Sequence, residues 1–141
     1  MSWSNDVIKL VIDRKLLENL VKQCVDYPFE KVFIGIGKVE EGVYSVEYVN
    51  ECRNIALEPL SRFVADPQCI LDTYRLAEER GKEITTLIHS HPAPPKPSSE
   101  DIKGMRLWRI PWIIINSYSG EYKAWIIHNE SLEEVYIEFI Q

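Results

Sequence analysis

Long apolar runs are missing from this chain of 141 residues, and no 18 consecutive apolar residues occur that would predict a membrane-spanning helix. The first residues also lack a basic segment followed by an apolar core, so no signal peptide is expected. Cationic side chains are in deficit: 16 Lys and Arg stand against 22 Asp and Glu, and the formal net charge of −6 disfavours a nucleic-acid surface. We therefore expect a cytoplasmic protein with neither membrane nor nucleic acid among its partners.

Cysteine is scarce too, with only Cys24, Cys52 and Cys69 in the chain. An odd number without a C-x-x-C pair predicts neither a full disulfide set nor a cysteine-based zinc site. Cys24 lies on the apolar stripe of a predicted helix and is expected in the core, whereas the sequence suggests no partner for Cys69. A reduced cytoplasmic setting is the simplest interpretation, and the role of the three cysteines stays open.

The composition that remains is that of a soluble globular domain, 45% hydrophobic and 27% charged. The length suffices for one hydrophobic core, so residues 1–141 are predicted to form a single domain. Helix-like and strand-like segments are interleaved along the chain, which predicts an α/β fold with a sheet covered by helices.

Hydrophobic periodicity and turn residues predict where these segments begin and end. Strands are expected at residues 7–12, 32–37, 43–49, 62–65, 84–88, 112–116, 122–127 and 132–140, the last of them at a sheet edge. One helix is capped by Asp13 and stops near Pro28, a second starts at Asp66 and stops at Gly81, and a third spans 98–109.

The region before and within the second helix carries two further expectations. Residues 50–61 show no clear period and are predicted to form a surface loop, close enough to a cleft to meet a substrate. In the helix itself the predicted buried stripe consists of Ile70, Leu71, Tyr74 and Ala77.

The strongest chemical pattern is H-S-H-P-x5-S-x-x-D, which starts at His89 and ends at Asp101. Because side chains two apart on a strand share a face, His89 and His91 present two imidazoles side by side. Ser98 and Asp101 have the spacing of a capping box, which places Asp101 in the first turn of a helix. Two histidines and a carboxylate suit zinc and leave a fourth position for water. Either half of the pattern alone is weak, but together they predict a metal site with His89, His91 and Asp101 as ligands.

This stretch resembles the motif of the JAMM (MPN+) zinc metalloprotease family, in which an upstream Glu precedes H-S/T-H and S-x-x-D. The resemblance implies a cytidine-deaminase-like α-β-α sandwich with a mixed sheet. It further implies one Zn²⁺ per chain, with a catalytic water, held by His89, His91 and Asp101, and an oxyanion-binding role for Ser98. The gap between His91 and Ser98 is six residues, one shorter than is usual in the family.

Glu30 is the candidate for the upstream Glu. The segment from Pro28 to Gly37 resembles the family pattern P-x-E-x-x-G-x-x-x-G, although Phe33 stands where a Gly is common. A lone Glu before a strand is usually a solvated residue. Together with the downstream motif, however, the match predicts Glu30 as the general acid–base, since zinc-dependent amide hydrolysis needs a carboxylate that takes and returns a proton.

The family resemblance implies the function as well: a JAMM-type, deubiquitinase-like isopeptidase that cleaves a ubiquitin-like protein, of the small archaeal-modifier or sulfur-carrier type, from lysine or peptide conjugates. Only nine residues separate Asp101 from Pro111, which is similar to the compact prokaryotic members. Three alternatives stay open: release of an amino acid such as cysteine from a sulfur-carrier protein, a non-catalytic MPN scaffold, and a zinc hydrolase for small molecules such as a deaminase. The sequence contains no P-C-x-x-C to support a deaminase. The oligomeric state is open, a homodimer included.

Two other features have simpler interpretations. The prolines at 92, 94, 95 and 97 predict a stiff, extended loop, with a proline-rich docking motif as the alternative. His128 has no ligand spacing to another residue and is predicted to be a surface or hydrogen-bonded histidine.

Overall fold

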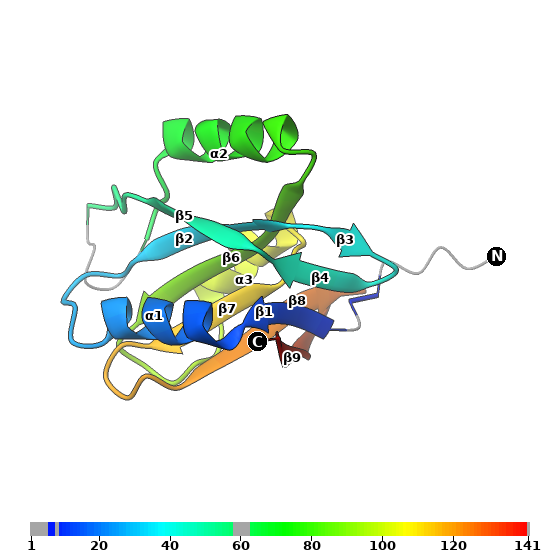
Figure 1. The fold of residues 1–141 in the computed structure, drawn as a ribbon. Coiled ribbons are helices and arrows are strands. Elements are labelled where there is room, and N and C mark those ends of the chain that lie inside the picture. Colours follow the sequence, from blue (N-terminus) through cyan, green and yellow to red (C-terminus); the bar gives the residue numbers. More distant parts are fainter. Residues whose placement is uncertain (1–5, 8, 58–62, 141) are drawn as a thin grey trace.

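A computed structural model of the chain describes residues 6–7, 9–57 and 63–140. Its strands form one mixed sheet in the order β3-β4-β1-β9-β8-β7-β6-β2-β5 (Figure 1). The elements are β1 (Lys9–Asp13), α1 (Arg14–Cys24), β2 (Val32–Gly37), β3 (Val39–Glu40), β4 (Val43–Val46), β5 (Tyr48–Cys52), α2 (Pro67–Glu79), β6 (Glu83–His91), α3 (Ser99–Leu107), β7 (Trp112–Asn116), β8 (Tyr122–His128) and β9 (Ser131–Ile140).

Two apolar cores, one on each face of the sheet, define the layers. On one face α1 buries Leu17 and Leu20 against sheet residues that include Ile88. On the other face Met105 of α3 packs with Trp112, and α2 contacts the same core. Figure 1 shows α1 on the opposite side of the central strands from α2 and α3. The predicted α-β-α sandwich with a mixed sheet is therefore confirmed. In the described part of the chain, all helices are too short or too polar to span a bilayer.

The interior of the sheet contains a β-α-β unit formed by β6, α3 and β7. β6 and β7 pair in parallel, with His89 opposite Ile114. Parallel neighbours need a crossover connection, and α3 provides it. The start of α3 therefore lies just beyond the carboxyl end of β6, which is where ligand sites form in sheets of this kind.

Helix boundaries follow the predicted capping chemistry. Asp13 accepts hydrogen bonds from the backbone N–H groups of Lys15 and Leu16 at the start of α1. Asp66 caps α2 in the same way, and Gly81 follows that helix with a φ of +66°. α1 ends at Cys24, earlier than predicted, because Val25 is already extended with a ψ of 129°, and Asp26 then adopts a left-handed conformation with a φ of 63°.

The prediction of β9 as an edge strand is wrong. Its first half pairs with β8, from Ser131 opposite His128, and its second half pairs with β1, as far as Ile140 opposite Asp13. Each half has a different partner, so the strand joins the two parts of the sheet. The local sequence pattern does not distinguish an edge strand from a strand that joins two parts of a sheet. The difference lies in the pairing with β1, which is distant in sequence.

The predicted strand 43–49 is two strands, β4 and β5, separated at Glu47, whose N–H donates to the Ile36 carbonyl. β5 continues to Cys52, so the first part of the predicted loop 50–61 is a strand paired with β2. In the predicted strand 62–65, Ala65 makes only an isolated bridge to Asn54. Residues 58–62 lie outside the described part of the chain.

The predicted buried stripe of α2 is only partly correct. Ala77 is buried, but Leu71 and Tyr74 are 44% and 48% exposed. Thr73 is fully buried instead, since its hydroxyl donates to the Cys69 carbonyl and accepts from the Asn50 amide. The apolar periodicity predicted the wrong inner face for α2, because that face holds a threonine. A threonine can be buried there since its hydroxyl is fully hydrogen-bonded.

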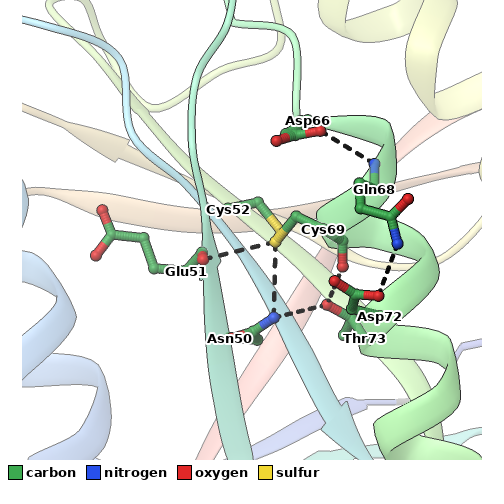
Figure 2. The surroundings of a disulfide bond; sticks show 8 residues. All are labelled: Asn50, Glu51, Cys52, Asp66, Gln68, Cys69, Asp72 and Thr73. Atoms are coloured by element: carbon green, nitrogen blue, oxygen red, sulfur yellow. Dashed lines mark hydrogen bonds between the residues drawn. A yellow bond between two sulfur atoms is a disulfide. The ribbon is translucent and has the colours of Figure 1, made fainter.

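The sequence suggested no partner for Cys69, and the structure supplies one. Cys52 at the end of β5 and Cys69 in α2 form a disulfide across 17 residues of sequence (Figure 2). Cys24 is buried and free, as its place on the helix stripe predicts. Pairing of Cys52 with Cys69 required β5 and α2 to be placed side by side, which local sequence patterns do not specify. Once two of the three thiols are paired, the cysteines no longer argue for a reducing compartment.

We predict that Cys69→Ser lowers the unfolding temperature by on the order of 10 °C. Closing a loop of this length removes unfolded-state entropy worth about 3 kcal/mol. Thermal unfolding followed by circular dichroism without reductant measures the change. A reductant should lower the parent to the same temperature and leave the variant unaffected. Equal unfolding temperatures for the oxidised parent and the variant would contradict a stabilising disulfide.

Candidate active site

The two histidines of the motif lie at the end of β6, as predicted. His89 is 1% exposed and His91 is 9% exposed, and their ring centroids are 5.6 Å apart. Asp101 reaches the same place from the first turn of α3, where its Oδ1 lies 3.1 Å from His89 Nε2. The crossover from β6 to α3 therefore brings together the strand and the helix start that carry the motif.

The predicted capping box fixes the orientation of Asp101. Ser98 Oγ accepts from the Asp101 N–H at 3.1 Å, and Asp101 Oδ2 accepts from the Ser98 N–H at 2.9 Å. One carboxylate oxygen is thus used by the cap, and the other is directed at His89. Both halves of the motif cooperate, because the helix cap also orients the candidate ligand.

The surroundings of two candidate ligands, Asp101 and His91, favour the protonation states in which these groups bind a metal. Burial acts to raise the pKa of Asp101, but the neighbouring His89 and the bonds from Ser98 outweigh it and hold that pKa below its ordinary value. Burial and the neighbouring His89 lower the pKa of His91, so its imidazole stays neutral. A charged carboxylate and a neutral imidazole are the forms that bind a metal.

A metal fits this donor set, although the described residues hold no three His, Cys, Asp or Glu side chains that already converge on one point. The evidence for the fit is His89 Nε2, which is buried without a hydrogen-bond partner among the described residues and yet faces Asp101 Oδ1. A cation between a ring nitrogen and a carboxylate oxygen would satisfy both. Two imidazoles and one carboxylate are a catalytic zinc set.

Among the described residues His91 does not converge on one point with the other two candidate ligands, and its ring contacts the proline loop. His91 Nε2 lies 2.8 Å from the Pro94 carbonyl, and the indole N–H of Trp125 donates to the Pro95 carbonyl at 2.8 Å. Because a carbonyl only accepts, Nε2 carries the proton in this arrangement and Nδ1 keeps the lone pair. Metal-bound histidines commonly make such a bond through the second nitrogen.

The proline loop is not the extended run that was predicted. Its backbone bends at 92–93 and 95–96, and the Lys96 N–H donates to the Pro94 carbonyl at 2.7 Å. Pro95 is buried. The carbonyls of Pro94 and Pro95 accept hydrogen bonds from within the domain. This favours a role of the proline loop in shaping the site over a role as a docking motif.

Glu30 lies beside His89 despite the separation in sequence. It lies two residues before the start of β2, which pairs with β6 so that Val32 is opposite His89. The side chain is 6% exposed, and Oε1 lies 3.7 Å from His89 Nδ1. Burial raises the pKa of Glu30 from its ordinary 4.5 to about 7; His89 lowers it in part, and Asp101 raises it. A carboxyl group with this pKa can both take and return a proton near neutral pH.

Ser90, the middle residue of H-S-H, has a function that the sequence did not indicate. Its side chain points to the opposite face from the histidines, and its Oγ accepts from the Lys31 N–H at 3.0 Å. The Ser90 N–H donates to the Lys31 carbonyl at 3.1 Å. These two bonds hold the residue next to Glu30 against the strand that carries the candidate ligands.

A cleft of about 540 Å³ joins these groups. Glu30, His91, Ser98 and Asp101 line it together with apolar side chains, and Phe63 lies with its ring centroid 4.4 Å from that of His89. Phe63 belongs to the predicted strand 62–65 and not to the predicted loop 50–61, and the structure places it between β5 and α2, in contact with His89.

Two residues outside the cleft agree with their simpler interpretations. His128 contacts carboxylates of Asp6 and Glu133, so it is a surface histidine with partners. Burial raises the pKa of the Cys24 thiol to about 11, although Ser90 and Lys31 lower it in part. This thiol is therefore neutral and unreactive at neutral pH. Fold and site together define the class of the protein, an α/β domain with a candidate metal centre at the end of an interior strand, β6.

Comparison with known proteins gives the family. Residues 13–128 match the family described as prokaryotic homologs of the JAB domain, so the chain belongs to that family. It is 34% identical over 123 residues to "Desampylase" of Pyrococcus furiosus, which covers 86% of this chain and 84% of that protein. It is also 34% identical over 110 residues to "Probable TtuB-protein conjugate cleaving protease" of Thermus thermophilus, covering 77% and 70%. The resemblance inferred from the motifs is confirmed.

Solved structures confirm the fold. A protein of Desulfitobacterium hafniense has a TM-score of 0.78 and 24% identity, with 94% of this chain and 93% of that chain covered. A protein of Salinibacter ruber has a TM-score of 0.68 and 20% identity, with 92% and 90% covered. At these identities the likeness concerns the fold alone.

We predict about one Zn²⁺ per chain after purification without chelators, and loss of that ion in His89→Ala, because one of three donors is removed. Metal analysis by mass spectrometry measures the content. His128→Ala is the matched control, a histidine outside the cleft that should leave the zinc content unchanged. Full zinc affinity in His89→Ala would show that this histidine is not a ligand.

Proposed function

We propose that the chain is a zinc-dependent peptidase that cleaves a ubiquitin-like protein from lysine or peptide conjugates. One observation carries the proposal: Glu30 and Asp101 line a single cleft, and both contact the ring of the buried His89, although the three residues come from separate parts of the sequence. The names of the two curated relatives support the reaction class, since one is a conjugate-cleaving protease and the other a desampylase.

His89, His91 and Asp101 would hold the zinc ion. Zinc, when bound, supplies acidification of water and polarisation of the scissile carbonyl. The protein would hold it through an anionic carboxylate and two imidazoles, and the capping box keeps the carboxylate in place. Phe63 and Trp112 lie within 4.4 and 6.0 Å of the His89 ring centroid and limit its access to bulk water.

Glu30 is the proton carrier in this proposal. Its carboxylate takes a proton from the attacking water and passes it to the leaving amine, so that the proton is conserved over one turnover. A pKa of about 7, raised by burial, gives both protonation states at neutral pH. The contact with His89 Nδ1 holds the carboxyl over the candidate metal strand.

Ser98 is the candidate for oxyanion binding. Its Oγ uses a lone pair to accept from the Asp101 N–H, so its own proton stays available to a partner in the cleft. A donor directed at the oxygen of a tetrahedral intermediate stabilises the charge that develops there. The same hydroxyl would thus cap α3 and bind the oxyanion.

Release of an amino acid from a sulfur-carrier protein uses the same residues and differs only in the leaving amine. No observation on the cleft favours it over conjugate cleavage, and mass spectrometry of the products separates the two reactions. A scaffold without catalysis is disfavoured, because all candidate ligands and Glu30 are present and buried together.

The decisive test is Glu30→Gln, which we expect to keep the fold and the zinc and to lose at least 10²–10⁴-fold in cleavage rate. An amide is nearly isosteric with the carboxyl group but cannot carry the proton. The rate is measured on a lysine-linked ubiquitin-like conjugate, with products identified by mass and zinc measured on the same sample.

Glu51→Gln is the matched control, since Glu51 is an exposed carboxylate of β5 that pairs with Lys31 and does not line the main cleft. Its variant should cleave at nearly the parental rate. A Glu30→Gln rate within a few-fold of the parent would exclude Glu30 as the base.

For Ser98→Ala we expect retained zinc and a turnover reduced by on the order of 10²-fold, because one oxyanion donor is removed. Loss of the cap should also destabilise the fold by about 1 kcal/mol. Turnover and thermal unfolding are measured together, with Ser99→Ala in the exposed neighbouring position as control. An unchanged turnover in Ser98→Ala would reduce Ser98 to a helix cap.

A further inference from the structure

Asn54 lies just after β5 and is hydrogen-bonded to the main chain of Glu30. Its Nδ2 donates to the Glu30 carbonyl at 2.8 Å. Its Oδ1 accepts from the N–H groups of Ala56 and Val64, both at 3.0 Å. One side-chain amide therefore connects three separate stretches of backbone.

The backbone around Asn54 is itself well held. The Ile55 N–H donates to the Val64 carbonyl at 2.9 Å, and the Asp66 N–H donates to the Arg53 carbonyl at 3.1 Å. These bonds join residues 53–56 to residues 63–66, next to the disulfide that fixes the end of β5 to α2. Asn54 thus lies on backbone that is hydrogen-bonded on both sides of it, and a positioning residue requires such support.

Glu30 needs such an anchor because it lies where the chain passes from an exposed turn into β2. The preceding residues Tyr27 and Phe29 are 41% and 42% exposed. The following residue, Lys31, is held by Ser90. Within the described residues, Asn54 makes the hydrogen bond that holds the Glu30 main chain itself.

We propose that Asn54 is a positioning residue that holds the Glu30 carboxyl in place over His89. The inference rests on the proposed role of Glu30 as proton carrier. Proton transfer requires the base within hydrogen-bond reach of its partner, and a misplacement of about 1 Å can cost on the order of 10²-fold in rate. The chain thus fixes its candidate base from two sides, through Ser90 on β6 and through Asn54 beyond β5.

Asn54→Asp tests this role. The aspartate keeps an acceptor for Ala56 and Val64 but replaces the donor that faces the Glu30 carbonyl with an oxygen. We expect kcat to fall by 10- to 100-fold, with KM and zinc content unchanged. Asn50→Asp is the matched control: it makes the same charge change on β5, where the amide donates to Thr73 and not to Glu30 (Figure 2). It should keep the parental kcat.

A second measurement needs neither metal nor substrate. In metal-free protein, hydrogen exchange at the Lys31 amide reports how firmly the segment after Glu30 is held against Ser90. We expect faster exchange in Asn54→Asp than in the parent and no change in Asn50→Asp. If Asn54→Asp fails to fold, Asn54→Ser replaces it, since a shorter hydroxyl side chain still caps the local N–H groups but does not reach the Glu30 carbonyl.

A double-mutant cycle completes the test. If Asn54 acts through Glu30, adding Asn54→Asp to Glu30→Gln should slow the residual cleavage by less than two-fold. The proposal is overturned if Asn54→Asp keeps kcat within two-fold of the parent, loses zinc together with activity, or leaves the Lys31 exchange unchanged. If the proposed function is wrong, the result is distinguishable from these outcomes. The parent protein then cleaves no conjugate, while the exchange measurement still reports the contact of Asn54 with Glu30.

Discussion

Two hydrogen bonds between Lys31 and Ser90 hold the candidate base beside the candidate ligands. They join the start of β2 to the end of β6 at the point where Glu30 and His89 lie side by side. One bond is between backbone groups. Ser90 can make the other through its hydroxyl because alternate residues of a strand face opposite sides, so the side chain between the two histidines is directed away from the cleft. The same strand therefore presents its histidines on one face and fastens the base from the other.

Burial gives the site its electrostatic character. His89 is almost fully buried between the carboxyl groups of Glu30 and Asp101. The two acids respond differently to their surroundings: hydrogen bonds from the capping box and the nearby His89 keep the pKa of Asp101 low, whereas burial dominates for Glu30 and raises its pKa to about 7. Two carboxyl groups on either side of one imidazole are thereby separated into a ligand and a proton carrier.

The walls of the cleft come from segments that are distant in sequence. Phe63 approaches His89 from the region between β5 and α2, and Trp125 on β8 holds the proline loop through the Pro95 carbonyl. The disulfide between Cys52 and Cys69 fixes the two ends of the first region. The ligand-bearing strand is thus surrounded by contacts that restrict both its access to water and the movement of its neighbours.

Sequence alone determined what depends on neighbouring residues. Strand alternation placed the two imidazoles of His89 and His91 on one face, and the S-x-x-D spacing specified the capping box that orients Asp101. Boundaries of β2 and β7 followed from their short apolar runs. These features could be predicted because dihedral preferences, side-chain period and capping act within a few residues. Glu30 was found only through its resemblance to a family motif.

Tertiary structure decided what depends on long-range pairing. The closeness of Glu30 to His89 arises from the antiparallel pairing of β2 with β6, and the disulfide arises from the approach of β5 to α2. β9 joins two parts of the sheet instead of forming an edge, because β1 pairs with its second half. Asn54 gives no signal in the sequence, since a polar residue after a strand is common and only its distance to the Glu30 carbonyl distinguishes it. Such contacts are set by the packing of the whole domain, and local sequence patterns do not encode them.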